Sequence, residues 1–238
     1  SQLSCEDFLL QRVYTKLCNF QHQLLNMKSF LLCIFTSLLL AQTHAQVLKT
    51  DANLLKLKAP ETFKAEFVTT KGNFTVEVYR NWSPLGADRF YQLIRSGYYN
   101  NTVIFRVVKD FLVQFGVSED KQKNIFWQGK NIKDEPVVAS NTDSTICFSR
   151  GAPNTRKTSI FINLRNNLTY DTLNAGGVKG FVPFAKVISG MDVVRHFFSG
   201  YGNDAMKPAD TIYFKGNKWF INKFPQIDLI KEAKVIKD

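Results

Sequence analysis

The chain has 238 residues, of which 45% are hydrophobic and 21% charged, with 13 glycines and 7 prolines. This is the composition of a folded domain, and it excludes collagen-like, low-complexity and wholly disordered chains. The net charge of +11 allows contact with nucleic acid or an anionic membrane surface but does not require it.

Residues 1–45 differ in pattern from the rest of the chain. A basic start at Met27-Lys28 precedes the apolar run Phe30–Ala41 and the small-x-small end Thr43-His44-Ala45. This order is typical of a secretory signal peptide, so we predict one over residues 27–45 and expect an exported protein, periplasmic or secreted. A permanent transmembrane helix is the alternative, but the apolar run is shorter than the ~20 residues that cross a bilayer.

The predicted cleavage divides the chain. Residues 1–26 form an upstream extension to which we assign no function, 46–60 an N-terminal linker, and 61–238 one domain with a C-terminal extension. Only Cys147 follows the cleavage site, so no internal disulfide is expected. Because Cys147 lies in an apolar, strand-like run, we interpret it as a buried small side chain and not as a reactive thiol.

The first predicted elements are a hairpin and a helix. Alternating strands at 65–70 and 73–78 flank Lys71-Gly72, a pairing and turn typical of antiparallel strands. A helix then begins with Ser83 as N-cap and Pro84 in its first turn, and it closes at Gly97.

A second hairpin is predicted from strands at 103–108 and 111–116, in which Arg106 and Gln114 are polar residues in otherwise apolar runs. Residues 117–142 are polar and irregular. The remaining predicted elements are strands at 145–148, 160–164, 181–187 and 230–236, and a helix at 191–198. Many strands with hairpin connections favour a mainly β, antiparallel architecture, either a sandwich or a closed barrel that removes exposed edges.

Most common catalytic motifs are missing from the mature sequence. Its single histidine is His196, and no His or Cys cluster has the spacing of metal ligands. There is no phosphate-binding loop, nucleophile elbow or dinucleotide fingerprint. We therefore expect no metal and no cofactor, and chemistry that does not depend on a histidine acid or base.

Phe105-Arg106-Val107-Val108 and Phe111-Leu112-Val113-Gln114-Phe115-Gly116 begin a series of collinear segments. Together these segments resemble the cyclophilin-type peptidyl-prolyl isomerases. Phe115 and the Gly180–Phe184 segment resemble the bacterial single-domain branch of that family, as does the tail from Phe224 to Ala233. The matching segments span most of residues 63–202. They are Phe105-Arg106-Val107-Val108, Phe111-Leu112-Val113-Gln114-Phe115-Gly116, Ile132-Lys133-Asp134-Glu135-Pro136, Ser140-Asn141, Gly151-Ala152-Pro153-Asn154-Thr155-Arg156, Phe161-Ile162-Asn163-Leu164, Gly180-Phe181-Val182-Pro183-Phe184, Gly190-Met191-Asp192-Val193-Val194 and Gly200-Tyr201-Gly202.

The resemblance implies a closed eight-stranded antiparallel β-barrel capped by two α-helices, with a substrate groove on its outer face. It also implies isomerisation of X-Pro peptide bonds, which breaks no covalent bond and therefore fits the missing acid and base groups. Arg106 would donate a hydrogen bond to the twisted amide, and Gln114 would bind the substrate backbone. The side chains expected to line the proline pocket are Phe111, Leu112, Phe161 and Tyr170.

Other groove positions follow from the same resemblance. The backbone of Ser149 and Arg150 would pair with an extended peptide. Phe105 and Phe181 stand at groove positions where many relatives have a histidine, and Ser159 replaces a glutamine. Residues 171–180 form an insertion beside the pocket.

Two functions remain open for the sequence. The first is a folding enzyme acting on proline-containing unfolded or extended polypeptides. The alternative, motivated by Ser159 and the insertion, is a proline-peptide-binding module with weak catalysis. We expect a monomer, no stable membrane insertion after signal cleavage and no nucleic-acid partner, because the lysines are not interleaved with aromatic residues in one block.

Overall fold

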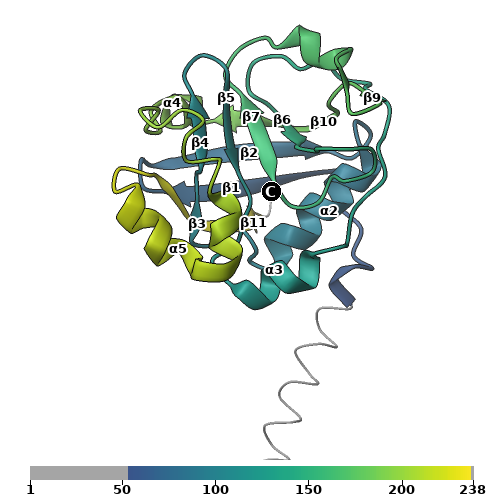
Figure 1. Cartoon of the computed structure of the whole chain (residues 1–238). Coiled ribbons are helices and arrows are strands. Elements are labelled where there is room, and N and C mark those ends of the chain that lie inside the picture. Colours follow the sequence, from purple (N-terminus) through teal and green to yellow (C-terminus); the bar gives the residue numbers. More distant parts are fainter. Residues whose placement is uncertain (1–52, 237–238) are drawn as a thin grey trace, which may run out of the picture. The chain divides into compact units, whose positions relative to one another are not determined.

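The computed structural model describes residues 53–236 (Figure 1). The predicted signal peptide, the upstream extension and the first part of the linker lie outside the described residues. The strands are β1 (Thr62–Thr69), β2 (Asn73–Tyr79), β3 (Thr102–Val103), β4 (Arg106–Val108), β5 (Leu112–Phe115), β6 (Thr145–Phe148), β7 (Ile160–Asn163), β8 (Asn174–Ala175), β9 (Val178–Lys179), β10 (Pro183–Ser189) and β11 (Leu229–Ile236). The helices are α2 (Pro84–Arg95), α3 (Lys121–Trp127), α4 (Met191–Arg195) and α5 (Ile212–Lys223), with 3-10 turns at Leu168–Asp171 and Ala209–Thr211.

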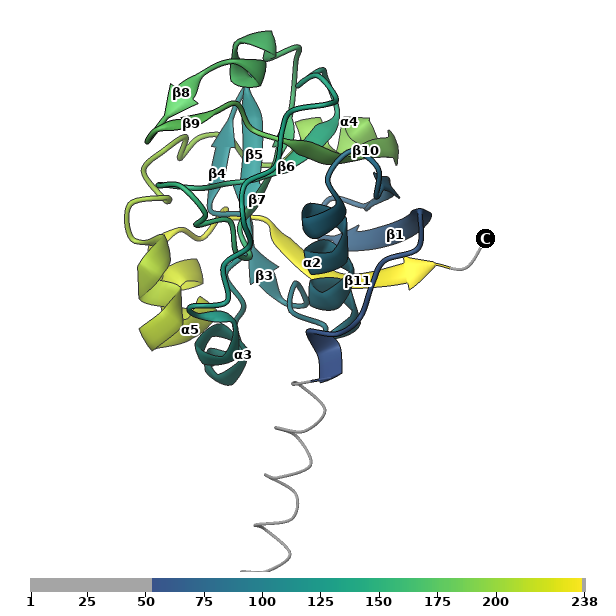
Figure 2. The same cartoon turned by 90° about the vertical axis from the view of Figure 1, so that its right-hand side faces the viewer.

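The architecture is mainly β, as predicted, and is built on one antiparallel sheet that curls into a half-barrel. Its strand order is β3-β11-β1-β2-β10-β6-β7-β5-β4, and β8 and β9 form a separate small hairpin. The last strand, β11, pairs along β1 (Figure 2), which joins the C-terminal end of the chain to its first strand.

The sheet differs from the predicted closed barrel of eight strands. The apolar run 103–108, predicted as one strand, splits in two: Val103 pairs with Leu229 of β11, and Arg106 pairs with Gln114 of β5. The two residues between them belong to neither ladder. The sheet therefore has nine strands, and its end strands β3 and β4 are not paired with each other.

The main core lies between the curled sheet and α2. Ser83 caps this helix as predicted, since its Oγ accepts from Gly86 N at 3.2 Å and Pro84 occupies the first turn. Phe90 and Leu93 of α2 are fully buried among the sheet's side chains. Burial of this apolar face, at roughly 25 cal/mol per Å², is what holds the helix on the sheet.

A second core lies outside the first and involves a helix that the sequence analysis missed. Ile212 and Phe220 of α5 pack with Val103 and Phe105. Helix α3, which lies beside α5 in Figures 1 and 2, falls in the region predicted to be irregular. The predicted helix 191–198 is shorter than expected and ends at Arg195.

A buried polar cluster holds the start of α2. Arg156 Nη2 donates to Glu135 Oε2 at 2.9 Å, and Arg156 Nη1 donates to Ser83 Oγ at 3.3 Å. Glu135 also accepts from the backbone N–H of Leu85 at 2.8 Å. These contacts satisfy helix N–H groups that have no partner within the helix.

Candidate active site

Arg106 and Gln114 face each other across two adjacent strands. The register pairs them directly, so their side chains leave the same face of the sheet. Arg106 Nη1 donates to Gln114 Oε1 at 3.1 Å, and Arg106 Nε donates to Asn203 Oδ1 at 2.7 Å. The guanidinium is thus held from two sides at the outer surface of the sheet.

Ser159 extends this polar chain by one more link. Gln114 Nε2 donates to Ser159 Oγ at 3.2 Å, and Ser159 Oγ donates to Phe115 O at 3.3 Å. Each hydrogen bond fixes the orientation of the next group, so the hydroxyl determines which way the amide of Gln114 presents its oxygen to Arg106. The short side chain of Ser159 therefore still contacts the site, although it replaces the longer glutamine implied by the family resemblance.

An apolar cluster adjoins the polar chain. Gln114 pairs in register with Phe161 of β7, which is 3% exposed and packs with buried Leu112 and Cys147. The half-buried rings of Phe111, Tyr170 and Phe181 pack on these three residues. Ring centroids in this cluster lie 5.0 to 5.8 Å apart. The predicted pocket residues are thus brought together, with Leu112 and Phe161 as floor and the three half-buried rings as rim.

Burial controls the titration of the groups at this site. It lowers the pKa of the half-buried Arg106 guanidinium, and it raises the pKa of the Tyr170 hydroxyl against the opposing charge of Arg106. Burial also raises the pKa of the Cys147 thiol well above its ordinary value. Cys147 is fully buried, as predicted, and its Sγ donates to Asn141 Oδ1 at 3.1 Å.

Arg150 contributes its side chain and not only its backbone. Its guanidinium lies 4.6 Å from the ring centroid of Phe181, and Nη2 donates to the carbonyl oxygens of Val178, at 3.0 Å, and Gly180. Its Nε lies 3.5 Å from Asp134 Oδ1. This arginine therefore anchors the end of the 171–180 insertion and one rim ring of the apolar cluster.

Two of the predicted substrate-contact residues have groups that are engaged within the protein. Phe105 is 4% exposed and packs in the second core with Val103 and α5, because the missed helix covers the position. Its ring does not reach the apolar cluster of the site. The amide of Ser149 is also not available to a peptide, since it already donates to Ser159 O at 2.9 Å.

Sequence analysis also missed a buried asparagine network beneath the site. Asn167 Nδ2 donates to Phe111 O at 3.0 Å and to Asn163 Oδ1 at 2.8 Å. Asn163 Nδ2 donates to Asn141 Oδ1, and Asn141 Nδ2 donates to Phe181 O at 2.8 Å. The network links the backbones of two rim residues. Two of these asparagines lie in the segments that resemble the cyclophilins, which was the available signal.

Asn203 was not among the predicted site residues, because the segments that resemble the family end at Gly202. It is exposed and immediately follows Gly200-Tyr201-Gly202, the last segment of the resemblance. A polar residue in a turn looks like ordinary surface until the fold places it beside Arg106.

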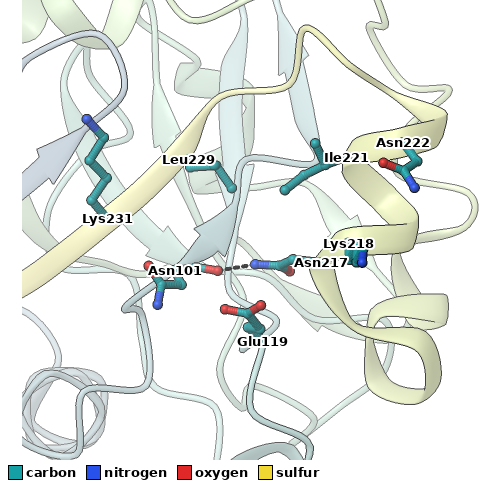
Figure 3. A pocket seen from close by; sticks show the side chains of 8 residues that line it. All are labelled: Asn101, Glu119, Asn217, Lys218, Ile221, Asn222, Leu229 and Lys231. Atoms are coloured by element: carbon teal, nitrogen blue, oxygen red, sulfur yellow. Dashed lines mark hydrogen bonds between the residues drawn. The ribbon is translucent and has the colours of Figure 1, made fainter.

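Two of the cavities outside the apolar cluster differ in their relation to the site. One of about 280 Å³ lies between α5, β11 and the turn before β3 (Figure 3), where Asn217 Nδ2 donates to Asn101 O. None of the predicted site residues lines it. The other, of about 430 Å³, is lined by Ser149, Arg150 and Ser159, with Tyr213 also contributing. The second cavity is therefore continuous with the candidate site.

Residues 53–236 contain neither a candidate metal-binding cluster nor a candidate membrane-spanning helix. No group of three or more His, Cys, Asp or Glu side chains in that range could hold a metal ion. No helix in the same range is long and apolar enough to cross a bilayer.

The amino-acid sequence is similar to those of known proteins. The profile of the family described as "Cyclophilin type peptidyl-prolyl cis-trans isomerase/CLD" matches residues 64–215. A peptidyl-prolyl cis-trans isomerase of Acinetobacter baylyi is 31% identical over 143 residues, which cover 59% of this chain and 74% of that protein. Peptidyl-prolyl cis-trans isomerase B of Escherichia coli is 33% identical over 135 residues, which cover 54% of this chain and 79% of that protein.

Solved structures share the fold. A crystal structure of a cyclophilin type peptidyl-prolyl cis-trans isomerase from Cryptosporidium parvum superposes with a TM-score of 0.53 at 17% identity, over 74% of this chain and 99% of that chain. A second crystal structure of that protein, obtained in the presence of the dipeptide Ala-Pro, gives a TM-score of 0.51 at 18% identity and the same coverage.

Proposed function

Because this chain belongs to the cyclophilin-type peptidyl-prolyl cis-trans isomerase family and is a peptidyl-prolyl isomerase, we propose that Arg106 is its catalytic residue and that the adjacent apolar cluster binds the substrate proline. The observation that carries this proposal is the position of Arg106. Its guanidinium is fixed by Gln114 and Asn203, and its centre lies 6.0 Å from the ring of Phe111 in the apolar cluster.

The obstacle to the reaction is amide resonance, which sets a barrier of about 20 kcal/mol to rotation of the X-Pro bond. Halfway through the rotation the proline nitrogen loses conjugation, and its lone pair can then accept a hydrogen bond. A donor that meets this lone pair binds the twisted amide better than either planar isomer. Such differential binding lowers the barrier without any covalent step.

Arg106 has the properties that this role requires. An arginine carries five N–H donors on a rigid plane and stays charged at working pH. Bonds to Gln114 and Asn203 occupy Nε and one N–H of Nη1, whereas Nη2 has no hydrogen-bond partner among residues 53–236 and is not cut off from solvent. The free donors are held in a fixed plane, so little reorganisation is needed when the amide twists.

The substrate proline would pack on the rim rings of Phe111, Tyr170 and Phe181. An apolar ring face provides contact area without hydrogen bonds that would favour one planar isomer. We propose proline-containing unfolded or extended polypeptides as substrates, in line with the Ala-Pro dipeptide used with the Cryptosporidium parvum protein. The carbonyl of the residue before proline is the group that Gln114 Nε2 would bind if it released Ser159.

The test compares the purified full chain with Arg106→Ala in a protease-coupled isomerisation assay on an Ala-Pro peptide. Loss of one charged hydrogen bond in the transition state should lower kcat/KM at least about tenfold. Thermal unfolding should remain nearly unchanged, because Arg106 is half-buried and no acidic side chain is paired with it within residues 53–236.

Asp204→Ala is the matched control, since Asp204 is an exposed charged residue whose side chain bonds only to Lys207 within residues 53–236. Equal rates for Arg106→Ala and the unmodified chain would contradict the assigned role. Tight binding of the peptide by an unmodified chain that has little turnover would instead favour the weak binding module considered from the sequence.

We also propose that the chain is exported and belongs to the bacterial single-domain branch. The proposal of export is supported by the basic start, apolar run and small-x-small end of residues 27–45. N-terminal sequencing of the natural protein should begin at Gln46, and an intact residue 27 would contradict export by this signal. Grouping of the chain with eukaryotic families in a broad sequence tree would contradict the branch assignment.

A further inference from the structure

We propose that Asn203 is a positioning residue for Arg106, and that through this one side chain the C-terminal segment, residues 198–228, contacts the active site. This inference rests on the catalytic role proposed for Arg106. Its central observation is the 2.7 Å hydrogen bond in which Arg106 Nε donates to Asn203 Oδ1.

The contact completes the restraint of the guanidinium. A single bond at Nη1, to Gln114, leaves the plane of the guanidinium free to turn about that bond. A second hydrogen bond, from Nε, removes this rotation, because the guanidinium is a rigid planar group and two of its three nitrogen atoms are then held. With Nε and Nη1 both held, Nη2 can point in only one direction. Asn203 thus acts on the orientation of the donor that meets the twisted amide, and not on the substrate itself.

The turn that carries Asn203 is anchored on both sides. Before it, the ring of Tyr201 lies 4.9 Å from Phe198 and 5.1 Å from Phe224, and its hydroxyl accepts from Gln226 N at 3.2 Å. After it, Ala205 is buried in the second core. An exposed amide on a free loop would hold an arginine weakly, since ordering the loop would cost entropy. Here the second core has already ordered it.

This arrangement gives the C-terminal segment a function beyond closing the fold. Its helix α5 packs on Phe105, the residue directly before Arg106, and the turn before that helix carries Asn203, the acceptor for Arg106. The segment therefore contacts both the backbone region before β4 and the guanidinium itself. Correct packing of the second core becomes a condition for full turnover.

The experiment measures kcat and KM separately for Asn203→Ala, Asn203→Asp and Asp204→Ala in the full chain. Asn203 has no left-handed backbone conformation, so alanine introduces no backbone strain. We expect Asn203→Ala to lower kcat about fivefold with KM unchanged, because the lost bond orients a transition-state donor. Asn203→Asp keeps an acceptor for Nε and should retain kcat, and Asp204→Ala should match the unmodified chain.

A double-mutant cycle separates positioning from a general effect on folding. In the Arg106→Ala background, Asn203→Ala should cause no further loss of kcat, since no guanidinium remains to be held. Unchanged kcat in Asn203→Ala, or an equal fivefold loss in the Arg106→Ala background, would overturn the inference.

The two proposals fail in different ways. If Arg106→Ala keeps full activity, the catalytic role of Arg106 is wrong and the role of Asn203 fails with it. If Arg106→Ala loses activity and Asn203→Ala does not, the catalytic role stands and only the positioning role is wrong.

Discussion

Arg156 and Arg106 each lie at the centre of a polar cluster, but they differ in how far their side chains are exposed to solvent. The side chain of Arg156 is 2% exposed, and its nitrogen atoms face Ser83, Glu135 and Asp134. Arg106 is half-buried, and only two of its nitrogen atoms are bonded within residues 53–236. Both residues lie in segments that resemble the cyclophilins.

The comparison indicates what would separate a structural arginine from the arginine proposed as catalytic. Arg156 directs Nη1 and Nη2 at protein acceptors, which ties the start of α2 to the segment around Glu135. Its Nε is buried without a hydrogen bond within residues 53–236, 3.6 Å from Asp134 Oδ1. Arg106 uses two bonds to fix its plane and keeps the remaining N–H groups for an acceptor that only a substrate supplies. Each arginine has one nitrogen atom without a hydrogen bond in the described part of the chain, so the access of that atom to a substrate acceptor, and not the residue type, distinguishes the proposed roles.

The largest expected effect is on stability and concerns Arg156. Arg156→Met removes the cation beside Glu135, whose side chain is 10% exposed, and leaves a buried carboxylate without its ion-pair partner. The free energy of unfolding should fall by about 3 kcal/mol or more. The kcat/KM of the folded protein should change less than about threefold, against at least about tenfold for Arg106→Ala. Denaturant unfolding and the isomerisation assay together check both expectations.

Arg195→Met is the matched control for that prediction. It removes the same charge from an ion pair with Asp143 at 2.7 Å in which both side chains are about two-fifths exposed, so the loss should be about 1 kcal/mol or less. A comparable loss of stability in the two variants would mean that burial of Arg156 does not set its contribution.

Some features of the fold and the site could be predicted from the sequence, and others could not. Alternation predicts most strands to within a few residues, and the polar positions 106 and 114 stand out in apolar strands, but their proposed catalytic role follows from the family resemblance. Periodicity cannot predict the split of the run 103–108, because every residue except Arg106 is apolar. Whether Phe105 faces a groove or a core depends on α5, and Gly216, at a φ of 69°, breaks the helical pattern of α5.

The site residues also differ in whether the sequence could predict them. Rim and floor residues follow from the family resemblance because they lie in recognisable motifs. Asn203 and the side chain of Arg150 act through contacts with residues 97 and 31 positions away in the sequence, respectively Arg106 and Phe181. Nothing local in the sequence encodes such contacts, since they exist only after the sheet has formed.

A smaller effect is expected at Ser159 and sharpens the account of Arg106. Ser159→Ala removes the acceptor of Gln114 Nε2, so the amide is less firmly oriented toward the guanidinium. We expect kcat to fall about threefold, and Ser159→Thr, which keeps the hydroxyl, to restore it. Ser96→Ala is the control, because its hydroxyl bonds only locally to Leu93 O at 2.9 Å. Loss of activity in both alanine variants would point to a general effect on folding.

The smallest expected effect is the response of the rate to pH between about 6 and 9. Ordinary pKa values are about 8.5 for cysteine, 10 for tyrosine and above 12 for arginine. Burial raises the pKa of Cys147 and of Tyr170, which moves both further above that range, so both groups stay neutral. Burial lowers the pKa of Arg106, but from a value far enough above the range that the guanidinium stays charged.

No group at the site therefore changes its charge between pH 6 and 9, and kcat/KM should vary less than about twofold over that range. His196, the single histidine within residues 53–236, is exposed, and its Nδ1 lies 2.7 Å from Asp192 O in α4. A bell-shaped profile with a limb near pH 6.5 would indicate a histidine acid or base. In that case the free edge of Arg106 would not be sufficient to explain catalysis, and the contrast with Arg156 would lose its functional meaning.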